Sequence, residues 1–319
     1  MHSWLTFSVK VGINLPQFGK QRNDELSILR DFVEKAERLR FDSVWVQDKC
    51  FQKNVSFIEP MTSLAFAAAY TAKIELGAAA IILPLKDPVM LTKIAATIDF
   101  LSDNRLILGV ALGNSQDYVA SCVPTSQRVP RFLEALQVMR MLCTREDVNF
   151  EGEHFQLSHA SISPRPNRKN GFPIWIGGGE IGSEVKDTVI RRAARLGDGW
   201  IGAGSTDITA FRNSCRKFEF YCKEFGKEGL IAQSIAKRIY IHVDHDREKA
   251  RQTLRERLSA LYNMEFDVDK LCIFGDEKEC ASQLADVLQS GNGTIILNSV
   301  TDYLDQEEIL MKDVIVNLK

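Results

Sequence analysis

The chain has 319 residues, 45% hydrophobic and 26% charged, a composition typical of a folded globular protein with a sizeable core. Forty basic residues against 42 acidic ones leave a net charge of −2, and no basic segment interleaved with aromatics suggests a nucleic-acid partner. Seven scattered cysteines without a CxxC pair, no apolar run near ~20 residues and no signal-peptide pattern predict a soluble, cytoplasmic protein with reduced thiols.

Strand and helix patterns alternate along the first half of the chain. Short apolar runs ended by turn residues indicate buried strands, and apolar residues at helical spacing indicate helices between them. In chain order we predict strand 9–15, helix 24–41, strand 43–47, helix 59–72, strand 74–82, helix 88–102, strand 105–112 and helix 129–143.

The second half continues the alternation after one interruption. Residues 148–164 alternate apolar and polar side chains around a Glu-Gly turn, which predicts an inserted β-hairpin. We then predict strand 173–179, helix 183–196, strand 199–204, helix 207–225, strand 238–243, helix 246–263, helix 277–290 and strand 294–298. Eight strands, each followed by a helix except at the chain's end, predict an α/β (β/α)8 TIM barrel forming one domain over 1–319.

The third predicted strand is unusually thin. In LGAAAIILPLKDP, residues 76–88, Ala78, Ala79 and Ala80 stand where a buried strand normally carries β-branched side chains. Two explanations stay open on these residues alone: a flat ligand lies against the backbone, or a bulky neighbour packs onto a plain small-residue strand. Active sites of such barrels form at the carboxyl ends of the strands, where these alanines lie.

A glycine-rich turn follows the fifth predicted strand. Gly177, Gly179 and Gly182 fit GxGxxG between a strand and a helix. Such a turn lets the backbone and the next helix's N–H groups approach a phosphate, although a tight turn that binds nothing explains the glycines equally well. Because four strands precede the turn and Asp198 lies before the next strand, a phosphate site in a barrel fits better than a dinucleotide-binding domain.

Other chemistries have weaker support. His242 and His245 lie in HVDHD, but no HExxH and no recurring His/Cys/carboxylate set occurs, so we predict no metal site. GxSxG is absent, which disfavours a serine hydrolase. Asp48 and Lys49 follow the second strand and are candidates for catalysis, with a surface ion pair as the alternative.

Several segments together resemble the bacterial luciferase-like monooxygenase family, in that family's order. They are GINLPQFG, FDSVWVQDK, IELGAAAIILPLKDPVMLTKIAATIDFLSDNRLILGVALG, VNFEGEHFQL, and PIWIGGG through GDGWIGAG. The resemblance is good over residues 9–204 and covers the remainder only through the ordinary barrel ending. It implies a flavin-dependent oxidoreductase.

The resemblance also implies cofactor-binding residues. Matching positions place a non-prolyl cis peptide at Ala79–Ala80, where the flavin ring of family members packs. Gly177, Gly178 and Gly179 would hold the cofactor phosphate, and Arg131 would neutralise its charge. Leu112, Gly113 and Asn114 would line the cofactor.

One position departs from the family. Many members carry a histidine after the aspartate of FDSVWV.D, and here that position is Lys49. A lysine of ordinary pKa is a poor general base near neutrality, so a histidine mechanism should not be transferred.

The implied function is a monooxygenase that uses reduced FMN, supplied by a flavin reductase, and O2 on a small organic substrate. The alternatives are hydride transfer with 8-hydroxy-5-deazaflavin and a non-catalytic flavin-binding protein. The broad apolar surfaces of helices 59–72 and 88–102 predict a homodimer through these helices, unless the hairpin or the C-terminal tail covers them.

Overall fold

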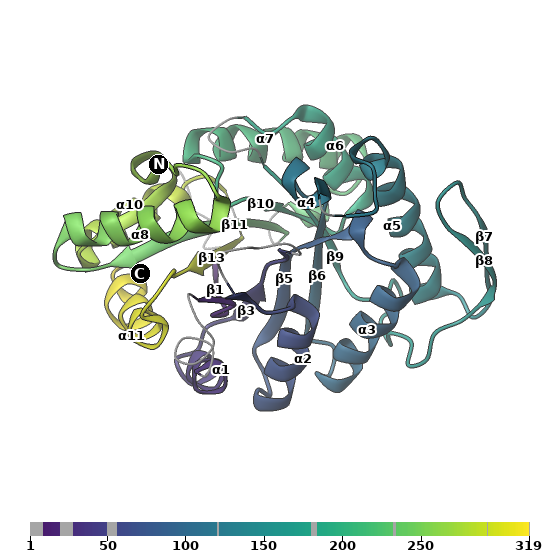
Figure 1. The fold of residues 1–319 in the computed structure, drawn as a ribbon, viewed down its shortest axis with the longest axis horizontal. Coiled ribbons are helices and arrows are strands. Elements are labelled where there is room, and N and C mark those ends of the chain that lie inside the picture. Colours follow the sequence, from purple (N-terminus) through teal and green to yellow (C-terminus); the bar gives the residue numbers. More distant parts are fainter. Residues whose placement is uncertain are drawn as a thin grey trace.

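A computed structural model describes residues 9–19, 28–49, 56–119, 121–179, 184–231, 234–291 and 293–318, and it contains the predicted closed barrel (Figure 1). The barrel strands are β1 (Lys10–Asn14), β3 (Ser43–Val46), β5 (Glu75–Ile82), β6 (Leu106–Ala111), β9 (Ile174–Gly178), β10 (Gly199–Gly202), β11 (Ile235–Val243) and β13 (Thr294–Asn298). Each pairs in parallel with the next in this order, and β13 pairs with β1 to close the ring. The fold class is therefore a (β/α)8 TIM barrel.

The helices predicted between the strands surround the barrel in Figure 1. They are α1 (Leu29–Arg38), α2 (Pro60–Tyr70), α3 (Pro88–Leu101), α5 (Arg128–Thr144), α6 (Asp187–Leu196), α7 (Ile208–Glu224), α8 (Arg247–Tyr262) and α10 (Glu277–Leu288). The predicted starts of the first helix, residues 24–27, and of the helix at 183 lie outside the described residues.

Short acidic caps start several of these helices. The side chains of Glu59 and Asp87 accept hydrogen bonds from the N–H of the third residue of α2 and α3, and each is followed by a proline as the first helical residue. Asp207 caps α7 in the same way. These caps satisfy N–H groups that a helix start leaves free, and so fix where the loops at the carboxyl ends of the strands stop.

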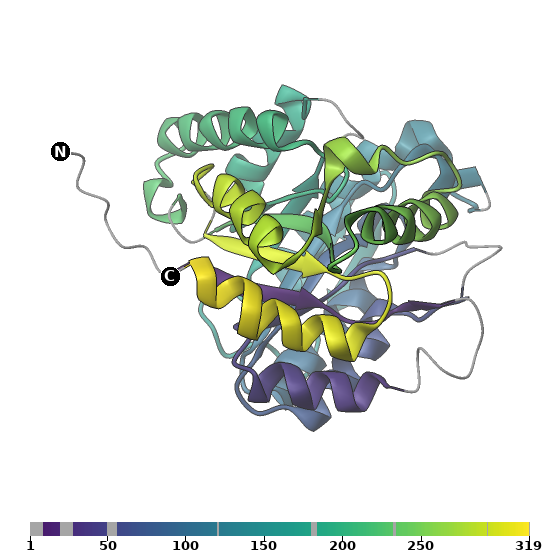
Figure 2. The same ribbon diagram turned by 90° about the vertical axis from the view of Figure 1, so that its left-hand side faces the viewer.

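Three further elements extend the predicted pattern. A ninth strand, β12 (Cys272–Gly275), pairs with the outer part of β11, in a stretch whose four residues gave too short a pattern to predict. The short helix α9 (Val268–Leu271) precedes it. The chain's final residues also form a helix, α11 (Tyr303–Ile309), which packs against α1 and completes the ring (Figure 2).

The predicted hairpin is present as β7 (Val148–Glu151) and β8 (Gln156–Ala160), which pair antiparallel. Figure 1 shows it extending outward beyond α5 and α3. The Glu134 carboxylate on α5 accepts hydrogen bonds from the backbone N–H groups of Glu153, His154 and Phe155, which ties the hairpin turn to the barrel.

The barrel interior explains part of the thin third strand. Trp45 and Trp175 lie in the interior with ring centroids 6.0 Å apart. A Cβ added to Gly77 would lie 2.2 Å from the Trp45 ring, so only glycine fits beneath it. A bulky neighbour, Trp45, therefore accounts for the small residue at Gly77, which lies one residue before the three alanines.

Candidate active site

A cavity of about 580 Å³ lies at the carboxyl ends of the barrel strands, where the active sites of such barrels form. It gathers all the predicted site residues except Arg131. They are Asp48, Lys49, Ala79, Ala80, Leu112, Gly113, Asn114, Gly177, Gly178 and Gly179. Gly182, the last glycine of the predicted motif, lies outside the described residues.

The cavity floor is formed by the end of β5. The Ala79–Ala80 peptide bond is cis, at the position that the family resemblance implied. The pairing between β5 and β6 shifts register here, so one extra residue bulges from the strand. A Cβ added to Gly177 would lie 3.1 Å from the Ala80 Cβ, so small residues on both sides keep this floor flat.

Asp48 holds this bulge in place. Its side chain is buried, and its Oδ2 accepts a hydrogen bond of 3.0 Å from the Ile82 N–H. Lys86 Nζ lies 3.1 Å from the same oxygen. These contacts tie Asp48 to the bulge and pair its buried carboxylate with Lys86, and the catalytic role suggested for it stays a prediction.

Lys49, Asp117 and Tyr262 share one end of the cavity, which we call the reaction end. The Lys49 ammonium lies 5.3 Å from the centre of the Tyr262 ring. Burial raises the pKa of Asp117, which the Lys49 charge and a hydrogen bond from the Asn114 N–H lower in part. Asp117 is thus a buried carboxyl beside a cation, and burial makes its protonated form easier to populate than that of an exposed aspartate.

Sequence reasoning missed Asp117, although a local signal exists. The Asn114 side chain accepts hydrogen bonds from the backbone N–H groups of Gln116 and Asp117, which starts the short helix α4 (Ser115–Val119). Gly113 precedes it with a φ of +70°, a conformation that favours glycine. The stretch Gly-Asn-Ser-Gln-Asp is therefore a turn that directs the Asp117 side chain back toward Gly113.

Gly177, Gly178, Gly179, Lys186 and Arg192 also line the cavity, from β9, α6 and the residues next to them, and we call this part the phosphate end. A Cβ at Gly178 or at Gly179 would lie 2.3 Å from a neighbouring side-chain atom, so both positions need glycine. Lys186 immediately precedes α6, at whose start no side-chain cap is formed, and the N–H of Val189 bonds to the Lys186 carbonyl. A helix start of this kind favours an anion.

Arg192 is the basic residue that stands out at the phosphate end. Its guanidinium lies 5.9 Å from the centre of the Phe132 ring. Burial lowers its pKa, and in the described part of the chain no carboxylate forms an ion pair with it. A half-buried cation without a counter-ion indicates a site for an anion.

Arg131 lies elsewhere. Its Nε donates a hydrogen bond of 3.2 Å to the Pro84 carbonyl, and its guanidinium lies 4.8 Å from the centre of the Phe155 ring. Arg131 thus connects α5 to the hairpin, and it does not line the cavity. The basic residues that do line it from the neighbouring helices are Arg128, Lys186 and Arg192, which sequence reasoning missed.

A buried polar chain on β11 backs the cavity. Arg238 donates to the Ala79 carbonyl at 2.7 Å, to Gln47 Oε1 at 2.8 Å and to the Tyr240 hydroxyl at 2.7 Å. The Tyr240 hydroxyl lies 3.0 Å from that of Tyr262. The sequence predicts an ordinary strand over residues 238–243. The direction of the Arg238 side chain, toward the cavity, follows only from the pairing of the strands in the folded barrel.

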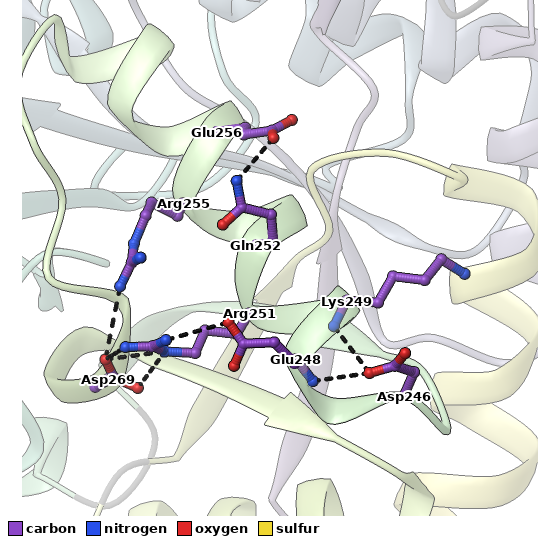
Figure 3. A network of polar contacts seen from close by, with 8 residues as sticks. All are labelled: Asp246, Glu248, Lys249, Arg251, Gln252, Arg255, Glu256 and Asp269. Atoms are coloured by element: carbon purple, nitrogen blue, oxygen red, sulfur yellow. Dashed lines mark hydrogen bonds and ion pairs between the residues drawn. The ribbon is translucent and has the colours of Figure 1, made fainter.

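The segment that follows Tyr262 is fixed by an ion-pair network on the outer surface (Figure 3). Arg251 of α8 contacts the Asp269 carboxylate of α9 at 2.6 Å, and Arg255 approaches the same carboxylate at 4.0 Å. Asp246 caps the start of α8 through the N–H groups of Glu248 and Lys249. The network holds α9 to α8, whose last residue is Tyr262.

Among the described residues, no three His, Cys, Asp or Glu side chains are grouped closely enough to hold a metal ion. His242 is buried, and His245 forms a surface pair with Glu277 at 3.8 Å. In the same part of the chain, no helix is both long and apolar enough to cross a membrane.

Solved structures of similar fold are redox enzymes. An F420-dependent secondary alcohol dehydrogenase, in complex with an F420-acetone adduct, has a TM-score of 0.81 at 20% identity and covers 98% of this chain and 99% of its own. A monooxygenase from Streptomyces bottropensis has a TM-score of 0.81 at 18% identity and covers 97% of this chain and all of its own. These likenesses support the barrel assignment.

Curated relatives are similar over parts of the chain. An F420-dependent glucose-6-phosphate dehydrogenase from Kineococcus radiotolerans is 33% identical over 54% of this chain and 51% of its own length. One from Amycolatopsis mediterranei is 26% identical over 71% of this chain and 69% of its own. The chain thus spans about half the length of several curated relatives that it matches.

A family model described as luciferase-like monooxygenase matches residues 2–267, which is most of the chain. The match confirms the resemblance inferred from the sequence motifs. The protein belongs to the luciferase-like monooxygenase family.

Proposed function

We propose that the cavity binds a phosphate-bearing flavin or deazaflavin and that the protein uses it to oxidise or reduce a small organic substrate. The observation that carries this proposal is Arg192, a half-buried cation without a carboxylate partner in the described chain, beside three glycines at the cavity's phosphate end. A phosphate there would receive a positive charge, backbone N–H groups and a helix start together.

The rest of the cavity fits the ring of such a cofactor. Ala79, Ala80 and Gly177 give a flat surface of small residues. Gln47 Nε2 and Arg238 Nε are buried donors in the cavity wall without a hydrogen-bond partner among the described residues. A ring edge with carbonyl oxygens would satisfy them. The bound cofactor would supply two-electron chemistry, and the protein would supply orientation and exclusion of water.

The favoured reaction is hydride transfer with the deazaflavin F420. Two curated relatives, at 33% and 26% identity, are named F420-dependent dehydrogenases. In this reading the substrate oxygen lies at the reaction end. Asp117, whose pKa is raised by burial, would hold or accept its proton, and the Lys49 ammonium would stabilise negative charge on it.

The second candidate is a monooxygenase that takes reduced FMN from a flavin reductase and uses O2. The description of the family model, luciferase-like monooxygenase, favours it. The same residues would bind FMN, because FMN and F420 share a planar tricyclic ring and a phosphate. For either candidate the substrate is a small organic molecule.

The experiment is equilibrium binding of FMN and F420 to the purified protein, followed by turnover. Tight F420 binding, with oxidation of reduced F420 by small ketones, would support the first candidate. Substrate oxygenation with reduced FMN and O2 would support the second. Tight binding without turnover in either assay would favour a non-catalytic flavin-binding protein, and no binding of either cofactor would refute the proposal.

A further inference from the structure

Arg238 is a buried guanidinium in the cavity wall whose hydrogen-bond partners among the described residues are all uncharged. It is 8% exposed, and its terminal nitrogens donate to the Ala79 carbonyl, the Gln47 amide oxygen and the Tyr240 hydroxyl. Within the described residues no carboxylate forms an ion pair with it. Its Nε, also buried, has no hydrogen-bond partner there.

This cation stays charged in its surroundings. Burial works to lower the pKa of Arg238, but the neighbouring Tyr240 and Tyr262 outweigh it and keep that pKa above its ordinary value. The adjacent base behaves differently, because burial and the Arg238 charge lower the pKa of Lys237 to about 7. Of the two buried bases, Arg238 therefore carries the permanent charge.

The charge is also directed at the floor of the cavity. The Ala79 carbonyl that Arg238 holds belongs to the cis peptide on which we place the cofactor ring. A buried charge without a counter-ion is unfavourable, and bound negative charge relieves it. The floor is thus a site that favours an anion, separate from the phosphate end where Arg192 lies.

We propose that Arg238 makes the cavity bind the reduced, anionic ring of FMN more tightly than its oxidised, neutral ring. This inference rests on the proposed function, since it needs the ring to lie over Ala79 and Ala80. Tighter binding of one redox form shifts the equilibrium toward that form, so Arg238 raises the reduction potential of the bound cofactor. Arg192 contributes nothing to this preference, because the phosphate is the same in both forms.

The test compares dissociation constants for oxidised and reduced FMN, measured anaerobically. A wild-type protein that binds F420 but not FMN would overturn this inference and leave the proposed function standing. Arg238→Gln should weaken binding of the reduced form by about tenfold or more relative to the oxidised form, as expected for loss of one nearby charge. Arg192→Gln is the matched control, and it should weaken both forms by a similar factor. Arg238→Lys, which keeps a charge, should retain part of the preference.

Two further results would overturn the inference. One is a folded Arg238→Gln protein with an unchanged ratio of the two constants. The other needs no variant: reduced FMN bound to the wild type should show the absorption spectrum of the anion at a pH where free reduced FMN is neutral, and a neutral spectrum would contradict the proposal. Wild-type protein that binds neither cofactor would instead refute the proposed function, and this inference with it.

Discussion

The two halves of the barrel contribute to the cavity in different ways. The first half, from β1 to α5, supplies shape: the bulge at Ala79 and Ala80, the turn at Gly113 and the buried tie through Asp48. The second half, from β9 onward, supplies charge through Arg192 and Arg238. The outer helices differ likewise, because α2 and α3 expose apolar side chains whereas α8 carries the ion-pair network of Figure 3.

The difference shows what the barrel requires at each place. Shape at the floor is made by the backbone, so it depends on small residues and glycines at fixed positions along the chain. Charge is placed by long side chains, which can reach the cavity from a helix or from the barrel interior. Substitutions at Ala80 should therefore act by excluding the ligand, and those at Arg192 and Arg238 by changing its electrostatic environment.

The largest effect is expected at the floor. Ala80→Leu should abolish binding of FMN and F420 while the fold stays intact, because the larger side chain would occupy the space of the ring beside Gly177. Fluorescence titration measures binding, and circular dichroism verifies the fold. Ala260→Leu on the exposed side of α8 is the control and should bind normally. Undiminished binding by Ala80→Leu would place the cofactor elsewhere.

The next effect concerns a buried acid in the second half. Glu307 on α11 is fully buried, neither carboxyl oxygen has a hydrogen-bond partner among the described residues, and burial raises its pKa to about 9. The charges of Lys35 and Arg38 on α1 lower this pKa in part. Between the unfolded value of 4.5 and about 9, the folded state holds a proton that the unfolded state has lost. Stability should therefore fall as pH rises through this window.

Urea unfolding at several pH values would measure this dependence. The contribution of one proton is at most ~1.4 kcal/mol per pH unit, so the wild type should lose up to about 4 kcal/mol between pH 5 and pH 8. Glu307→Gln removes the titrating group and should flatten the profile, while Glu308→Gln, at the exposed neighbouring position, should leave this loss in place. A wild-type profile without any fall above pH 5 would contradict the prediction.

Features set by the backbone could be predicted from the sequence, whereas the positions of long charged side chains could not. Strand and helix periodicity predicted every barrel strand, because buried strands and helices repeat their apolar residues at fixed spacing. Gly177, Gly179 and the alanines of β5 left two explanations open, and only the family resemblance turned them into a predicted cofactor site. Arg238 and Arg192 form no such pattern, since each reaches the cavity only through the register of β11 or the rotation of α6. Arg131 was chosen by position along the resembling helix, and its side chain turns instead toward Pro84 and the hairpin.

Replacing Arg192 and Arg131 by glutamine, one at a time, tests which of the two arginines binds the phosphate. Arg192→Gln should weaken FMN binding by about tenfold to a hundredfold and leave riboflavin nearly unaffected, because a charge-assisted hydrogen bond contributes ~1.5–3 kcal/mol and only FMN carries the phosphate. Arg131→Gln is the matched control and should change neither affinity by more than a small factor. The reverse pattern would restore Arg131 to the phosphate site.

The outer face of α2 and α3 exposes several apolar side chains. Phe66 and Tyr70 of α2 are each 37% exposed, and Met90 and Ile94 of α3 are 59% and 41% exposed, so the described residues leave this apolar face uncovered. Ala65 lies on the same exposed side of α2, whereas Ala68 is buried under the Arg105 guanidinium. We propose that a second copy of the chain covers the face, because an apolar area of this kind is rarely left in water.

The smallest effect is expected for a single charge placed on that face. Ala65→Glu should raise the dissociation constant of the homodimer by about tenfold, or ~1.4 kcal/mol, because the carboxylate loses water on association without gaining a partner. Sedimentation velocity over a dilution series measures the change. Ala260→Glu makes the same substitution at an exposed alanine of α8, amid the charges of the second half, and should leave the sedimentation of the protein unchanged. Equal effects of the two variants would mean that the dimer does not form through α2, and a wild-type protein that sediments as a monomer at micromolar concentration would leave the apolar face without the partner we assign to it.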